Sequence, residues 1–180
     1  MAVLARTLNA LALLGICGVL LFAFYWQIVR GELPCPLCLL QRAAFLAAGF
    51  GFLLNVRFGS SESHYGVVIV SSLAGAAFAV RQILLHIVPG TGAYGSVVLG
   101  YHFYTWALIG FVVLIGFAGV MLFIEAQFVE GVRDVRPSPG SQALGWLFVL
   151  VVLANAVSTL LECGFGPCPD NPTEYELLMK

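Results

Sequence analysis

The chain has 180 residues, of which 61% are hydrophobic and only 9% are charged, and its formal net charge is −1. Soluble domains carry about 25% charged residues, so a protein of this composition could not cover its surface in water. The near-neutral charge also excludes a basic surface for nucleic acid. The length suits one domain, and the long apolar runs predict an all-α integral membrane protein.

In chain order, five segments are predicted to cross the bilayer as helices, because each can supply the roughly 20 apolar residues that a crossing needs. The first, fourth and fifth contain no charge, whereas the second and third each include one arginine near an end, Arg42 and Arg81. The predicted helices cover residues 8-29, 37-56, 65-88, 102-124 and 141-161, and a tail covers residues 162-180. We therefore predict a single membrane domain over residues 1-180.

The basic residues outside the predicted helices favour one orientation. They divide four to two between the two sides of the bundle: Arg6, Arg57, Arg133 and Arg136 against Arg30 and Lys180. The side with fewer basic residues also carries the acidic tail. Because the more basic side of a membrane protein faces the cytoplasm, we predict a cytoplasmic N-terminus and a C-terminus on the outer side.

Four of the five cysteines form two pairs, Cys35 with Cys38 and Cys163 with Cys168. The first pair follows the first predicted crossing and the second pair follows the fifth. Four crossings separate them, so both pairs face the same compartment whichever way the chain is inserted. The remaining cysteine, Cys17, lies midway along the first helix and is predicted to be a small buried hydrophobic residue.

The Cys35-Pro36-Leu37-Cys38 sequence allows three interpretations: a redox-active pair, half of a metal site, or a structural disulfide. The short ring that such a disulfide closes favours exchange over stabilisation. Pro36 suits the first position of a helix, which places Cys38 in the first turn, where the helix dipole favours a thiolate. Arg42 lies one turn further on the same face and favours the thiolate too. The alternative for Arg42 is an interfacial arginine that reaches the headgroups.

The tail pair lies in a run rich in glycine and proline, Cys163-Gly-Phe-Gly-Pro-Cys168. Such a loop could open to the thiol of a partner, or it could be a structural clip.

A zinc site made of all four paired cysteines is the main alternative, which would make the chain a metal-binding membrane protein. The apolar surroundings of the first pair and the positive charge of Arg42 oppose a bound cation, so we predict no metal ligand.

Three further polar side chains lie near the outer end of the third predicted helix: Arg81, Gln82 and His86. Gln82 and His86 are four residues apart and so share one helical face. Hydrogen-bond donors at this depth could bind the carbonyl of a buried ligand. Packing between helices through polar side chains is the equally open alternative.

The run from Cys35 to Arg42, read as Cys-Pro-Leu-Cys-Leu-Leu-Gln-Arg, resembles the disulfide-bond-formation protein B (DsbB) family, as does the Arg81-Gln82 segment. The resemblance covers roughly the first four helices. It implies a four-helix transmembrane bundle in a bacterial inner membrane, here with a fifth transmembrane helix added, and a periplasmic tail. It also implies an oxidoreductase that reoxidises a periplasmic thioredoxin-fold (DsbA-like) protein and passes electrons to a membrane quinone, either ubiquinone or menaquinone.

By position, the resemblance implies that Cys35 and Cys38 are the quinone-proximal redox pair and that Arg42 lies beside the quinone. The chain departs from the family pattern in one place. The second cysteine pair of the family lies between the third and fourth helices, whereas here it follows the fifth helix as Cys163 and Cys168. We expect electrons to pass from the partner to the tail pair and then to Cys35 and Cys38. A structural membrane subunit with clip disulfides, and electron flow in the opposite direction, remain as alternatives.

Overall fold

The computed structural model describes residues 2–88, 90, 92–128 and 138–178. Five long helices dominate these residues, as predicted, and each is long and apolar enough to cross a membrane. The elements in chain order are α1 (Ala2–Val29), α2 (Pro36–Phe58), α3 (Glu62–Leu85), β1 (Val97–Val98), β2 (Tyr101–His102), α4 (Phe103–Leu122), the short 3-10 helix η1 (Glu125–Gln127) and α5 (Pro139–Cys163). The chain is therefore an all-α membrane protein with almost no sheet.

The helix ends differ from the predicted ends for local reasons. The third helix ends at Leu85 rather than at residue 88, shortly before Pro89, because the residues preceding a proline disfavour helical backbone. The fifth helix begins two residues early, because the Ser138 hydroxyl accepts a hydrogen bond from the Ser141 N–H at 3.2 Å and caps it. It ends where Gly164 takes a positive φ of 61°.

The connection between α3 and α4 contains a small hairpin that the sequence did not predict. β1 pairs antiparallel with β2, and the two-residue turn between them is Leu99-Gly100, both with positive φ. Positive φ at both central positions gives the turn that suits the twist of a hairpin. Strands of two residues are too short to leave an alternating pattern, so only the structure reveals them.

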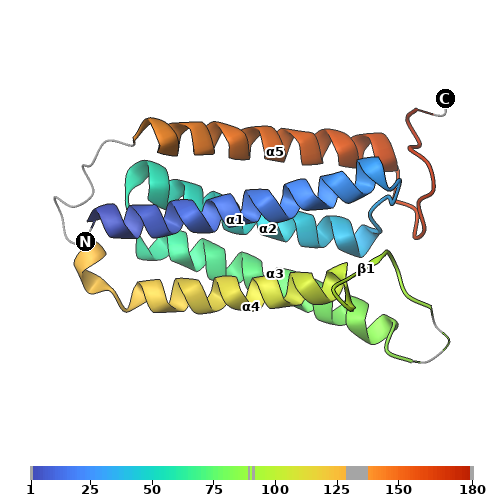
Figure 1. The fold of residues 1–180 in the computed structure, drawn as a ribbon, viewed down its shortest axis with the longest axis horizontal. Helices are drawn as coiled ribbons and strands as arrows, with labels where there is room; N and C mark the ends of the chain where they lie inside the picture. Colours follow the sequence, from blue (N-terminus) through green and yellow to red (C-terminus); the bar gives the residue numbers. More distant parts are fainter. Residues whose placement is uncertain (1, 89, 91, 129–137, 179–180) are drawn as a thin grey trace.

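The helices pack in layers. Figure 1 shows α1 and α2 in the middle, with α5 on one side and α3 and α4 on the other. The start of α2, the hairpin, the end of α5 and the tail all lie at one end of the bundle (Figure 1). Both cysteine pairs are therefore at the same end, in agreement with the counting of crossings. Arg133 and Arg136, which supported the predicted orientation, lie outside the described residues.

Two glycines allow the layers to approach closely. A Cβ atom on Gly75 of α3 would lie 2.3 Å from the ring of Phe111 on α4, and one on Gly49 of α2 would lie 2.5 Å from the ring of Phe148 on α5. Phe111 also stacks on Phe45 of α2, with ring centroids 4.0 Å apart. Aromatic rings thus fill the spaces that the glycines leave. Cys17 is fully buried in the same core, as predicted.

At the opposite end from the cysteines, a buried hydrogen-bond network joins four elements. The Asn9 side chain on α1 donates to the Tyr65 hydroxyl on α3 at 2.7 Å, and Asn55 on α2 donates to Asn9 at 2.9 Å. The Tyr65 hydroxyl donates in turn to Gln127 of η1 at 2.9 Å. Because each polar group has a partner, this network holds the bundle together without leaving buried donors unpaired.

Candidate redox site

Cys35 and Cys38 lie where α2 begins. Cys35 is the residue that caps the helix, and its Sγ accepts a hydrogen bond from the Cys38 N–H at 3.2 Å. Pro36 is the first helical residue, so Cys38 lies in the first turn, close to the unpaired backbone donors. Both thiols are free, and Cys35 is buried whereas Cys38 is half-buried. A hydrogen bond with the Cys38 side chain, together with burial, raises the pKa of Cys35.

Gln82 of α3 contacts both sulfurs. Its Nε2 donates to Cys35 Sγ at 3.2 Å and approaches Cys38 Sγ at 3.5 Å. Its Oε1 accepts a hydrogen bond from Gln41 Nε2 at 2.7 Å, which fixes the direction of the amide. The side chain is 1% exposed. An amide donor aimed at two sulfurs stabilises negative charge on either of them as the pair changes its redox state.

Arg42 is held by α1. Its Nη1 donates to Gln27 Oε1 at 2.6 Å and its Nη2 donates to the Ala23 carbonyl at 3.3 Å, while the guanidinium lies over the Phe24 ring. Gln27 in turn donates to residues at the end of α5 and in the tail. These contacts hold the guanidinium against α1. An arginine inside a membrane bundle is costly and marks a functional site by default.

A cavity of about 550 Å³ opens beside these residues, between α1, α2, α4 and the connection that precedes α4. Cys38, Gln41 and Arg42 are its polar contributors from α2. The rest of the wall is mainly apolar and rich in aromatic rings, among them Phe22, Trp26, Phe45, Phe103, Tyr104 and Trp106. A mainly apolar cavity with a few convergent polar groups is the usual form of a small-molecule site.

The segment before α4 forms one wall of this cavity. The Ser96 N–H donates to the Glu32 carboxylate at 3.0 Å, and the Ser96 hydroxyl donates to the same carboxylate. The Tyr94 hydroxyl donates to the Leu33 carbonyl at 2.6 Å. Burial raises the pKa of Tyr94, so the hydroxyl remains a donor. These bonds tie the connection before α4 to the connection before α2.

Three of the predicted ligand-binding residues do not line the cavity: Arg81, Gln82 and His86. Arg81 is exposed. His86 follows the last residue of α3, where its Nδ1 lies 3.1 Å from the Gly92 carbonyl and its ring stacks on Tyr104. His86 is thus the residue that caps the end of α3. Gln82 reaches the sulfurs instead of the cavity.

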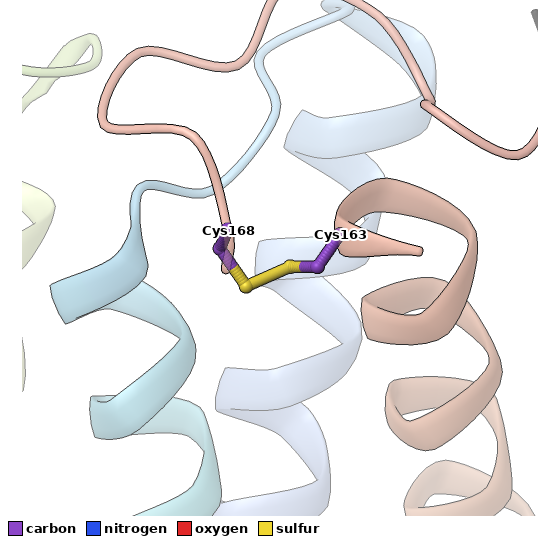
Figure 2. Close-up of a disulfide and its surroundings, with 2 residues drawn as sticks. All are labelled: Cys163 and Cys168. Atoms are coloured by element: carbon purple, nitrogen blue, oxygen red, sulfur yellow. A yellow bond between two sulfur atoms is a disulfide. The ribbon is translucent and has the colours of Figure 1, made fainter. Parts of the chain in front are cut away.

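The tail pair forms a disulfide, Cys163–Cys168, at the end of the bundle where α2 begins. Figure 2 shows the bridge between the last turn of α5 and the returning tail. Cys163 is 4% exposed, whereas Cys168 is half-buried, and Phe165 at the tip of the loop is 92% exposed. The bridge thus has an inner sulfur and an outer sulfur.

The tail folds back onto the bundle beyond the disulfide. The Leu177 N–H donates to the Leu161 carbonyl at 3.1 Å. Gln27 Nε2 donates to the Ser158 hydroxyl at 2.7 Å and to the Tyr175 hydroxyl at 3.0 Å. Since Gln27 also accepts from Arg42, a continuous chain of hydrogen bonds leads from the tail and α5 to the arginine beside the cavity.

Sequence reasoning gave no role to three residues of this site: Gln27, Gln41 and Glu162. Each is a polar side chain within a predicted or adjoining apolar helix and each is at least 95% buried. A polar residue inside a membrane span is itself a signal, which could have identified Gln27 and Gln41, whereas Glu162 fell in the predicted tail. Within the described residues, no group of three or more His, Cys, Asp or Glu side chains is placed to hold a metal ion, so the four paired cysteines do not form one cluster.

The chain is similar in sequence to known proteins of one family. Residues 5–93 match the family model described as "Disulfide bond formation protein DsbB". The proteins named disulfide bond formation protein B of Hahella chejuensis and Nitrosomonas eutropha are 41% identical over 88 residues and 39% identical over 84 residues. These matches cover 47% and 44% of this chain, and 53% and 52% of the relatives.

A third relative with the same name, from Marinobacter nauticus, is 40% identical over 89 residues, or 47% of this chain and 53% of the relative. The chain therefore spans about half the length of the curated relatives it matches. No solved structure matches it. The family match contains Cys35, Cys38, Gln41, Arg42 and Gln82, whereas α4, α5 and the tail lie beyond it.

Proposed function

We propose that the chain, whose residues 5–93 match the DsbB family model, is a membrane protein-disulfide oxidoreductase of that family. It reoxidises a thioredoxin-fold, DsbA-like protein on the periplasmic side of a bacterial inner membrane and uses membrane quinone as the electron acceptor. The five helices form one membrane domain with a cytoplasmic N-terminus and a periplasmic C-terminus. The observation that carries the proposal is the cysteine pair at the edge of an apolar cavity with an inward-facing arginine.

The donor set of the cavity fits a quinone. A quinone head is a flat apolar ring with carbonyl oxygens that accept hydrogen bonds, and it dissolves in the bilayer. Arg42 and Gln41 would hold a carbonyl oxygen, the aromatic walls would hold the ring, and Cys38 would face it from the start of α2. When bound, the quinone accepts two electrons and two protons and becomes a quinol.

The chain's own cysteines carry the electrons to that point. A thiolate of the partner attacks the Cys163–Cys168 disulfide and forms a mixed disulfide, which the second thiol of the partner resolves. The partner leaves oxidised, and the tail pair becomes a dithiol. The tail dithiol then exchanges with an oxidised Cys35–Cys38 pair, which becomes the dithiol shown in the structure. Gln82 donates to both sulfurs of this pair as charge passes between them.

The test is quinone reduction by the purified full chain in lipid nanodiscs, driven by a reduced thioredoxin-fold dithiol protein and followed by quinone absorbance. Replacing Cys38 with Ala should abolish turnover, because the inner pair can no longer form a disulfide. The matched control is Cys17→Ala, which removes a buried cysteine outside both pairs and should keep turnover. Quinone reduction that persists in the Cys38 variant would overturn the relay.

Arg42→Leu separates the quinone site from the thiol chemistry. We expect the KM for quinone to rise about tenfold or more, because a charged hydrogen bond contributes about 1.5–3 kcal/mol. Exchange between the tail pair and the inner pair should continue, as measured by trapping free thiols after a single turnover. An unchanged KM would remove Arg42 from the quinone site.

A further inference from the structure

Glu162, in the last turn of α5, is a buried carboxyl that the relay described so far does not use. It is 0% exposed, and among the residues that the structure describes neither carboxyl oxygen has a hydrogen-bond partner. Burying a polar group without a partner costs free energy, and the cost is larger for a charged group. A buried carboxyl without a hydrogen-bond partner therefore requires an explanation, either a function or a partner that binds only transiently.

The returning tail seals this carboxyl from water. The Glu176 N–H donates to the backbone carbonyl of Glu162 at 3.5 Å. The Leu177 N–H donates to the backbone carbonyl of Leu161 at 3.1 Å. Tyr175, which precedes these residues, is held by Gln27 of α1. The tail thus lies over the end of α5, and Glu162 faces the interior of the bundle.

The charged and titratable groups around Glu162 are those of the redox site. Arg42 and Cys38 of α2 interact electrostatically with it, as does Tyr94 of the connection before α4, and Tyr175 of the tail lies within range of Arg42. Arg42 directs its own hydrogen bonds to Gln27 and to α1. The guanidinium therefore attracts a negative charge on Glu162 while leaving the carboxyl oxygens free to accept a proton.

The neighbouring residue is Cys163, the inner sulfur of the tail disulfide. Glu162 and Cys163 are both buried at the end of α5, whereas Cys168, the other half of the disulfide drawn in Figure 2, is half-buried. When the tail pair is reduced, the Cys163 thiol and the Glu162 carboxyl are thus consecutive residues at the same buried end of α5. Exchange with the inner pair requires a thiolate, so the proton of that thiol needs an acceptor.

We propose that Glu162 accepts the thiol proton of the reduced tail pair and returns it during exchange with the Cys35–Cys38 disulfide. The Glu162 carboxylate takes the proton of Cys163, and the Cys163 thiolate attacks the inner disulfide, which forms a mixed disulfide and releases one inner thiolate. Glu162 returns the proton to that thiolate, then accepts the proton of Cys168. The Cys168 thiolate attacks the Cys163 sulfur of the mixed disulfide, closes the tail disulfide and releases the second inner thiolate, which takes the proton from Glu162.

Two electrons and two protons thus pass from the tail pair to the inner pair, and Glu162 ends as the carboxylate with which it began. The inference rests on the proposed function, because it assigns a proton-transfer group to the exchange within that relay.

The test compares Glu162→Gln with the wild-type chain in nanodiscs, with exchange between the two pairs followed by rapid acid quenching and thiol trapping. A positioned general base contributes roughly 100-fold or more, so we expect a loss of that order at pH 7. Without the carboxylate, exchange depends on spontaneous thiol ionisation. The rate of the variant should therefore rise with pH up to the range of a free thiol, near pH 8.5, and approach that of the wild type there.

Two further variants distinguish proton transfer from a structural role. Glu162→Asp keeps a carboxyl and should keep the wild-type pH profile at a lower rate, whereas Glu174→Gln, on the exposed part of the same tail, should change neither. Equal pH profiles for wild type and Glu162→Gln would overturn the proposal, as would an Asp variant that behaves like the Gln variant.

If Glu162→Gln does not fold, time-resolved infrared spectroscopy of the wild-type chain tests the proposal instead. A protonated-carboxyl band that rises and decays with exchange supports the proposal, and the absence of this band overturns it.

A small dithiol as reductant separates this inference from the proposed function. Dithiothreitol can reduce the inner pair directly, so the Glu162 variants should reduce quinone at the wild-type rate with it. If the wild-type chain reduces quinone with neither dithiothreitol nor a protein dithiol, the proposed function fails. If the wild type reduces quinone with both and Glu162→Gln is unaffected with both, only the assignment of Glu162 fails.

Discussion

At the scale of single residues, Gln82 connects the two cysteines of the inner pair to the rest of the bundle. Its amide nitrogen is 3.2 Å from Cys35 Sγ and 3.5 Å from Cys38 Sγ, and its oxygen is occupied by Gln41. The Gln82 amide group therefore cannot flip without losing its contacts with the two sulfurs and with Gln41. Its position relative to the sulfurs is set by α3, so the pairing of α2 with α3 determines how the thiols are solvated.

Gln82→Leu should slow alkylation of Cys38 by iodoacetamide about tenfold at neutral pH. The reason is that a hydrogen bond to a charged acceptor contributes about 1.5–3 kcal/mol, and the thiolate is the reactive form. The rate is measured by mass spectrometry of the reduced protein at several pH values.

A matched control for this variant is Gln127→Leu, which removes a buried glutamine from the hydrogen-bond network at the other end of the bundle. This variant should lower thermal stability and leave the alkylation of Cys38 unchanged. Equal reactivity of Cys38 in wild type and Gln82→Leu would show that the amide does not stabilise the thiolate.

At the scale of elements, close packing of α3 on α4 depends on the absence of a side chain at Gly75. A Cβ atom there would lie 2.3 Å from the Phe111 ring, which is itself stacked on Phe45 and cannot move away. Gly75→Ala should therefore push the two helices apart and lower the stability of the bundle by about 1–3 kcal/mol. The measurement is thermal unfolding of the purified protein in detergent, followed by circular dichroism.

Gly66→Ala is the control on the same helix, because a Cβ atom at Gly66 meets nothing within 4 Å. Alanine favours the helix over glycine by about 1 kcal/mol, so this variant should unfold at the same temperature as the wild type or higher. A Gly75 variant as stable as the Gly66 variant would mean that α3 and α4 do not pack through this contact.

Most of the transmembrane helices could be predicted from the sequence, whereas fewer of the contacts within the candidate site could be. Long uncharged runs determine where helices cross a bilayer, and the place of Cys38 in the first turn of α2 follows from Pro36 and the cap at Cys35. The interactions of Arg42 with Gln27 and of Gln27 with Tyr175 join residues 15 and 148 positions apart, and only the packing of α1 against α2 and α5 brings them together.

At the scale of the whole molecule, both cysteine pairs lie at one end of the bundle and the hydrogen-bond network of Asn9, Asn55 and Tyr65 lies at the other. The bundle thus has one end that carries both cysteine pairs and one end without a cysteine among the described residues. The proposed relay needs this arrangement, since the partner's thiols and both cysteine pairs must share a compartment.

The proposed orientation predicts which face a membrane-impermeant maleimide reaches in intact bacterial spheroplasts. After mild reduction, a chain that keeps Cys168 as its only cysteine should be labelled from outside, because Cys168 is half-buried in the tail rather than enclosed. A chain without native cysteines that carries Ser63→Cys, an exposed position in the first turn of α3, should be labelled only after the membrane is permeabilised.

Ser63 and Cys168 lie at opposite ends of the bundle, so the two chains must give opposite results if the protein spans the membrane once per helix. Labelling of Ser63→Cys from outside, with protection of Cys168, would invert the orientation and place both cysteine pairs in the cytoplasm. Thiol exchange with a periplasmic partner would then be impossible. If both positions are labelled from outside, an even number of crossings would separate Ser63 from Cys168, against the three helices that lie between them.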